Sequence, residues 1–104
     1  MRLKGDTVAL QSLVPQVVLA LWMANEVYNG HGIDMVLTSG SDSRHSNTSL
    51  HYSGQAVDLR TNNIPTEPLK GTIAREIKKK LNVDYDVVLE SDHIHLEYQP
   101  RMPR

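Results

Sequence analysis

The chain contains no cysteine, and this absence restricts both the folds and the sites that it can form. Disulfide scaffolds, cysteine-based zinc fingers and thiol nucleophiles are all excluded. The 104 residues must therefore build a hydrophobic core, which a chain of this length can do without cross-links. Phenylalanine is absent and Trp22 is the single tryptophan, so valine, leucine and isoleucine have to fill most of that core. We predict a single domain over residues 1–104.

The charges of the chain are nearly balanced, with 11 lysines and arginines against 12 aspartates and glutamates. This balance gives no electrostatic reason to expect a nucleic acid or membrane partner, and we expect a monomer. Residues 1–6 lack the apolar stretch of a signal peptide, and the apolar segment 13–24 is too short to span a bilayer. We therefore expect the protein to remain in the cytoplasm of the cell that makes it.

Two segments have the apolar spacing of amphipathic helices. The first extends from an N-cap at Ser12 to a stop at Asn29-Gly30, and the second opens at Thr66. The apolar positions of the first helix are Val14, Val18, Leu21 and Tyr28, supported by Val17 and Trp22. Those of the second helix recur every four residues, at Leu69, Ile73, Ile77 and Leu81.

Four short runs favour β-strands, at residues 35–38, 56–60, 86–90 and 94–98. The last two are separated by a short polar turn, which indicates a hairpin. Residues 41–52 are polar and nearly free of apolar side chains, and a loop of this length suggests a functional role. The expected fold is α+β, with two helices packed on a small antiparallel sheet of about four strands.

Four of the five histidines fall in two short stretches, residues 45–58 and 90–97. A catalytic zinc site takes three protein ligands from histidine, aspartate and glutamate and keeps a fourth position for water. His51, Asp58 and His95 would supply two imidazoles and one carboxylate. A metal bound there lowers the pKa of its water from about 15.7 to about 7, which produces a nucleophile at neutral pH.

The spacing in the second stretch adds a constraint. His93 and His95 are two residues apart, so on a strand both project from the same face, with Glu97 behind them. Asp92 precedes His95 by three residues, a reach suited to a general base acting on the metal-bound water. His31, beside the Gly30 turn, has the setting of an ordinary surface histidine.

Both stretches resemble motifs of one enzyme family. Residues 49–58, with the sequence SLHYSGQAVD, resemble the SxHxxGxAxD signature of the zinc D-Ala-D-Ala peptidases of the M15 type. Residues 92–95, DHIH, resemble the downstream acid-x-x-His element of that family. The family includes carboxypeptidases and dipeptidases that act on bacterial cell-wall peptides, and phage endolysins. Its members share a small α+β fold, also found in the hedgehog signalling domain, whose antiparallel sheet carries the metal.

The resemblance implies a role for each matching residue. His51, Asp58 and His95 would be the ligands of one zinc ion per chain, and Asp92 the general base. Ser49 would contact substrate near the metal. By the same resemblance His93, the first histidine of His-x-His, would hydrogen-bond a transition-state oxygen.

Other residues are open to more than one interpretation. In the family an arginine shortly after a Ser-Gly turn polarises the scissile carbonyl, whereas Arg44 stands later than the usual place. Arg44 is therefore either catalytic or an ordinary exposed arginine. His45, in the same loop, is a candidate substrate contact. Glu90 competes with Asp92 for the role of base, and Glu97 is expected to support the ligands or the fold.

These roles predict zinc-dependent hydrolysis of a peptide bond in peptidoglycan stem peptides, of the D,D or L,D type. A lone domain without a signal peptide favours a phage or prophage lysis enzyme, which reaches the wall after a separate protein permeabilises the membrane. A cytosolic D,D-dipeptidase is a further interpretation. The alternative from another class is a zinc-binding virion or interaction domain without turnover. Asp92 argues against that alternative, because a structural metal site needs no base.

Overall fold

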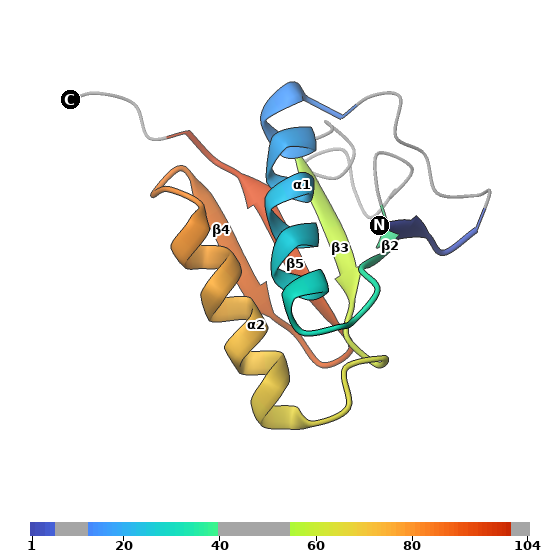
Figure 1. Ribbon diagram of the computed structural model, residues 1–104. Coiled ribbons are helices and arrows are strands. Elements are labelled where there is room, and N and C mark those ends of the chain that lie inside the picture. The colour runs from blue at the N-terminus through green and yellow to red at the C-terminus, as the bar shows by residue number, and fades with distance from the viewer. Residues whose placement is uncertain (6–12, 40–54, 101–104) are drawn as a thin grey trace.

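The structure is a computed structural model that describes residues 1–5, 13–39 and 55–100. Two helices and five strands follow one another in the order β1-α1-β2-β3-α2-β4-β5 (Figure 1). The helices are α1 (Pro15–Gly30) and α2 (Glu67–Lys80). The strands are β1 (Arg2–Leu3), β2 (Val36–Ser39), β3 (Ala56–Arg60), β4 (Tyr85–Leu89) and β5 (His93–Tyr98). Neither helix is long and apolar enough to cross a membrane.

The five strands form one sheet in the order β1-β2-β3-β5-β4. The pairs β2–β3, β3–β5 and β5–β4 are antiparallel, whereas β1 pairs with β2 in parallel. The predicted α+β class is confirmed, and the predicted antiparallel sheet gains a short parallel strand at its edge. A strand of two exposed residues has no alternating pattern, so the sequence carries no signal for it.

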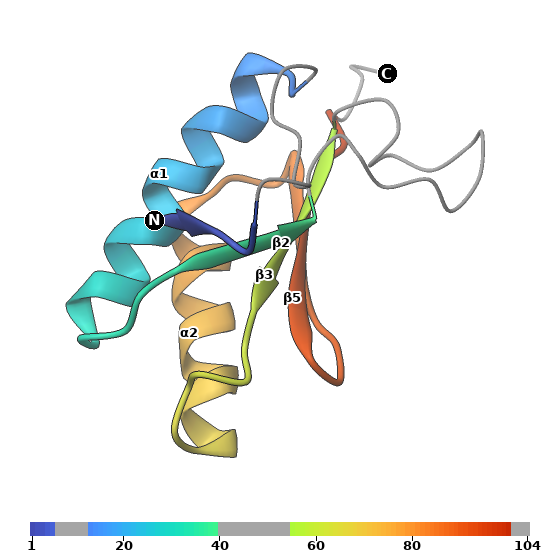
Figure 2. The ribbon, with the colours of Figure 1, turned by 90° about the vertical axis from the view of Figure 1, so that its right-hand side faces the viewer.

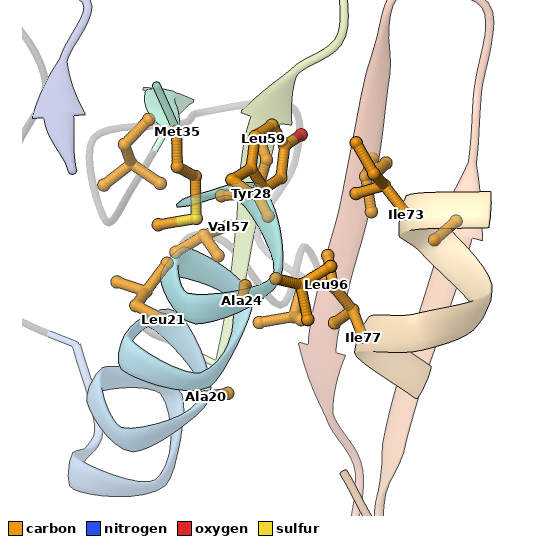
Figure 3. Packing of buried hydrophobic residues seen from close by; sticks show 14 of the residues in the cluster. Ala20, Leu21, Ala24, Tyr28, Met35, Val57, Leu59, Ile73, Ile77 and Leu96 are labelled. Atoms are coloured by element: carbon orange, nitrogen blue, oxygen red, sulfur yellow. The ribbon is translucent and has the colours of Figure 1, made fainter. Parts of the chain in front are cut away.

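Both helices lie on the same face of the sheet and pack against each other there (Figure 2). Figure 3 shows Ile73 and Ile77 of α2 beside Leu96 of β5 in the layer between helices and sheet. All three side chains are fully buried. The face of the sheet opposite α1 and α2 is called the outer face below.

Helix α1 confirms the predicted segment but not all of its buried positions. The helix begins at Pro15, after Val14 as its N-cap, while Ser12 lies outside the described residues. Val18 and Trp22 were expected in the core but are 41% and 57% exposed. Ala20 and Ala24 occupy the core instead, because their small side chains let the helix approach the sheet closely (Figure 3). Since α1 is apolar on nearly every side, helical spacing alone does not identify its buried face.

Helix α2 and the hairpin match the sequence predictions. The hydroxyl of Thr66 accepts a hydrogen bond of 3.2 Å from the backbone N–H of Leu69 and caps α2. Ile73 and Ile77 are buried, and Leu69 and Leu81 pack against the same core. Strands β4 and β5 are joined by the predicted turn, which the Glu90 N–H closes by donating to the His93 carbonyl at 2.8 Å.

Candidate metal centre

The register of β3 and β5 brings the polar side chains of the two strands together on the outer face. Asp58 lies directly opposite His95, and Arg60 lies opposite His93. Alternate residues of a strand point to the same face, so Asp58, His93 and His95 all project away from the buried Ile94 and Leu96 positions. Directly opposed residues have Cβ atoms about 4.5–5.5 Å apart, close enough for their side chains to interact.

Asp58 is in contact with both histidines. Its Oδ1 lies 3.0 Å from Nδ1 of His95 and 3.5 Å from Nε2 of His93. One potential ligand atom from each of the three residues lies within 4.8 Å of the others. The side chains of Asp58, His93 and His95 are 14%, 28% and 22% exposed, so they are partly shielded yet reachable from solvent. One carboxylate and two imidazoles form a donor set that can hold a divalent transition metal.

The two ring nitrogens of His95 face two different carboxylates. Nδ1 faces Asp58, and Nε2 lies 2.8 Å from Oε1 of Glu97. The hydrogen bond to Asp58 raises the pKa of His95 to about 9, with a smaller contribution from Glu97, and together they outweigh the lowering effect of burial. Protein without metal therefore carries a protonated imidazole between two carboxylates at neutral pH.

Asp92 lies in the turn before β5 and contacts His93. Its Oδ1 is 2.6 Å from Nδ1 of His93, and its side chain is 79% exposed. His93 thus bridges the exposed carboxylate of Asp92 and the half-buried carboxylate of Asp58. An exposed carboxylate beside an imidazole of the candidate metal centre can exchange protons with water. Glu90, the competing candidate for the base, is an exposed residue that immediately follows β4.

The structure brings together four of the residues predicted from the sequence: Asp58, Asp92, His93 and His95. The predicted ligand His51 lies outside the described residues, as do the candidates Arg44, His45 and Ser49. The structure shows two further contacts to the candidate ligands that the sequence analysis did not predict. Glu97 engages Nε2 of His95, and the Thr38 hydroxyl donates to the backbone carbonyl of Asp58 at 3.3 Å. Alternation along β5 is a sequence signal for Glu97, whereas the Thr38 contact depends on a β2–β3 register that no sequence pattern encodes.

A second cluster of charged groups lies where the ends of α1 and α2 meet, away from the outer face. It lines a hollow of about 480 Å³, in which His31 Nε2 contacts Glu76 Oε1 at 2.9 Å and Lys80 contacts Glu26 at 3.4 Å. His31 is therefore a surface histidine with a hydrogen-bond partner, as expected. These contacts link α1 to α2, and they do not include any residue of the candidate metal centre.

Comparisons of the chain with protein-family models and with curated proteins find no match. The geometry around Asp58 and the two sequence motifs are therefore the observations from which a function can be inferred.

Proposed function

We propose that the chain is a zinc-dependent peptidase that hydrolyses a peptide bond in peptidoglycan stem peptides. The observation that carries this proposal is the meeting of one carboxylate with two imidazoles on the outer face, in a register fixed by β3 and β5. Asp58, His93 and His95 occur in the two stretches whose sequences resemble those of the zinc D-Ala-D-Ala peptidases.

The donor chemistry of the site fits zinc. Zinc is bound by imidazole nitrogen and carboxylate oxygen, and a catalytic ion needs three protein ligands and an accessible fourth position. Asp58 and His95 would hold one ion per chain, with His51 as the third ligand. When bound, the ion would supply an acidified water molecule and a Lewis acid for the scissile carbonyl. Partial exposure of Asp58 and His95 leaves access for a peptide.

The acid–base work falls to Asp92. Its exposed carboxylate takes a proton from the attacking water and delivers it to the leaving amine. The contact of 2.6 Å with His93 Nδ1 holds the two side chains together. To donate through Nε2 to Asp58 or to a substrate oxygen while Nδ1 donates to Asp92, the His93 ring must carry a hydrogen on both nitrogens.

The role of His93 separates two versions of the site. In the version that we propose, His51 completes the ligand set and His93 donates a hydrogen bond to the oxyanion as charge develops. In the other version His93 is itself the third ligand, which its distance of 3.5 Å from Asp58 permits. Zinc content distinguishes them, because His93→Ala keeps the metal in the first version and His51→Ala keeps it in the second.

The deciding experiment combines metal analysis with digestion of purified peptidoglycan. Protein purified without added metal should contain about one equivalent of zinc and should release new peptide termini that mass spectrometry can identify. Zinc without hydrolysis of wall or of free D-Ala-D-Ala would favour a binding domain of the same fold. Activity on free D-Ala-D-Ala alone would identify a cytosolic dipeptidase. A protein that binds no zinc would overturn the proposal.

A further inference from the structure

We propose that Glu97 is a positioning residue that orients His95 so that Nδ1, and not Nε2, is the nitrogen that binds the metal. This inference rests on the proposed metal site, and it concerns a residue outside both sequence motifs. The contact of Glu97 Oε1 with His95 Nε2, at 2.8 Å, is the observation from which it starts.

The two nitrogens of an imidazole ring point in diverging directions, so an ion shared with Asp58 can use only the nitrogen that faces Asp58. That nitrogen is Nδ1, at 3.0 Å from Asp58 Oδ1. A neutral imidazole carries one hydrogen and one lone pair. With its lone pair on Nδ1 directed at the ion, His95 must carry its hydrogen on Nε2, where Glu97 accepts it.

Glu97 is placed to hold the ring and not the ion. It follows His95 by two residues on β5 and therefore shares the outer face. Among the described residues, the group whose ligand atoms all lie within 4.8 Å of one another comprises Asp58, His93 and His95, without Glu97. Ala56 lies opposite Glu97 on β3, and its small side chain leaves the carboxylate room to fold toward the ring.

A carboxylate in this position affects the metal through the ligand. Accepting the Nε2 hydrogen fixes the tautomer and the ring orientation and makes Nδ1 a stronger electron donor. Glu97 is only 14% exposed, so competition from water for this hydrogen bond is limited. Loss of such a partner typically lowers metal affinity by about 10-fold to 100-fold.

The test is the zinc affinity of the full chain, measured by competition with a chromophoric chelator at fixed pH. Glu97→Ala should bind zinc about 10-fold to 100-fold more weakly than the wild type. Glu97→Gln keeps an oxygen acceptor on a side chain of the same size. Its zinc affinity should therefore lie between those of the wild type and Glu97→Ala. Thermal unfolding in the presence of chelator checks that each variant is folded.

The chain offers a matched control in Glu76, whose Oε1 contacts Nε2 of His31 at 2.9 Å. Glu76→Gln removes the same charge from the same kind of pair, away from the outer face, so zinc affinity should stay within about two-fold of the wild type. A second readout is the nitrogen NMR spectrum of His95 in the zinc-loaded protein. It should show the proton on Nε2 and the metal on Nδ1.

The possible outcomes separate this inference from the proposed function. Tight zinc binding by both the wild type and Glu97→Ala, or a metal on Nε2, would overturn the role of Glu97 and leave the metal site standing. Failure of the wild type to bind zinc would overturn the metal site and the role of Glu97 together.

Discussion

The two faces of the β3–β5 strand pair divide stability and chemistry between adjacent residues. On the face covered by α1 and α2, Val57, Leu59, Ile94 and Leu96 are fully buried. On the outer face, the neighbouring side chain of Asp58 is partly exposed and contacts the imidazoles of His93 and His95. Because successive residues of a strand point in opposite directions, one segment of chain supplies both environments.

Because of this division, the hydrophobic core fixes the backbone positions of the candidate ligands, although the ligands themselves lie outside the core. Ile94 and Leu96 are held in the hydrophobic cluster, so His95 between them has little freedom to rotate its backbone. Asp58 is fixed in the same way between Val57 and Leu59. A site on a packed strand pair can therefore be preorganised, even though its side chains contribute little apolar burial of their own.

The largest expected difference between the faces is in the free energy of unfolding. Leu96→Ala removes a fully buried side chain and should cost about 2–5 kcal/mol. His95→Gln, at the adjacent position on the outer face, should cost less while lowering zinc affinity at least about 10-fold. Urea unfolding in the presence of chelator measures the first effect without metal-linked stability. An equal loss of stability in both variants would show that the outer face belongs to the folding core.

The two aspartates that contact His93 should fail in different ways. Asp92→Asn should keep its zinc and lose at least about 100-fold in turnover, the scale of a general base. Asp58→Asn, in which the altered group is 14% exposed and contacts both histidines, should instead lose metal affinity. Zinc content and the rate of release of new peptide termini measure the two effects. If Asp92→Asn is active and Glu90→Gln is inactive, Glu90 is the base.

The fold was predictable wherever a periodic pattern was long enough to read. The predicted strand 56–60 coincides with β3, and α2 begins after its predicted cap at Thr66. The edge strand β1 was missed because two residues carry no period. Val18 and Trp22 of α1 were assigned to the wrong side because that helix is apolar on nearly all sides.

The candidate site was predictable in its residues more than in its contacts. Alternation along β5 correctly placed His93, His95 and Glu97 on the same face. The pairing of Asp58 with His95 joins residues 37 positions apart, across α2, and such a register is a property of the assembled sheet. The division of the two His95 nitrogens between Asp58 and Glu97 follows from that register, so it could be seen only in the structure.

A smaller effect concerns pH in protein freed of metal. The pKa of His95 is raised to about 9 in the folded state, against about 6.5 for an unperturbed histidine. The protonated ring therefore stabilises the fold fully below about pH 6.5, and this contribution, on the order of 2 kcal/mol, is lost as the pH rises through about 9. Urea unfolding at pH 6 and at pH 9.5 with chelator should show the decline. His95→Gln should remove this part of the pH dependence, and a wild type without the decline would contradict the assignment.

The smallest expected effect tests the division of faces on the neighbouring strand β4, with the same substitution at two adjacent valines. Val87 packs against the hydrophobic cluster, whereas Val88 is 45% exposed and lies in register with His95. Threonine keeps the shape and β-branching of valine, so Val→Thr mainly adds a hydroxyl group to be desolvated. Val87→Thr should cost about 1–2 kcal/mol, and Val88→Thr should change stability by less than about 0.5 kcal/mol. Urea midpoints at equal slope measure both changes. Equal costs would mean that the two faces are no longer distinct at this edge of the sheet, because a hydroxyl is penalised only where water is excluded from it.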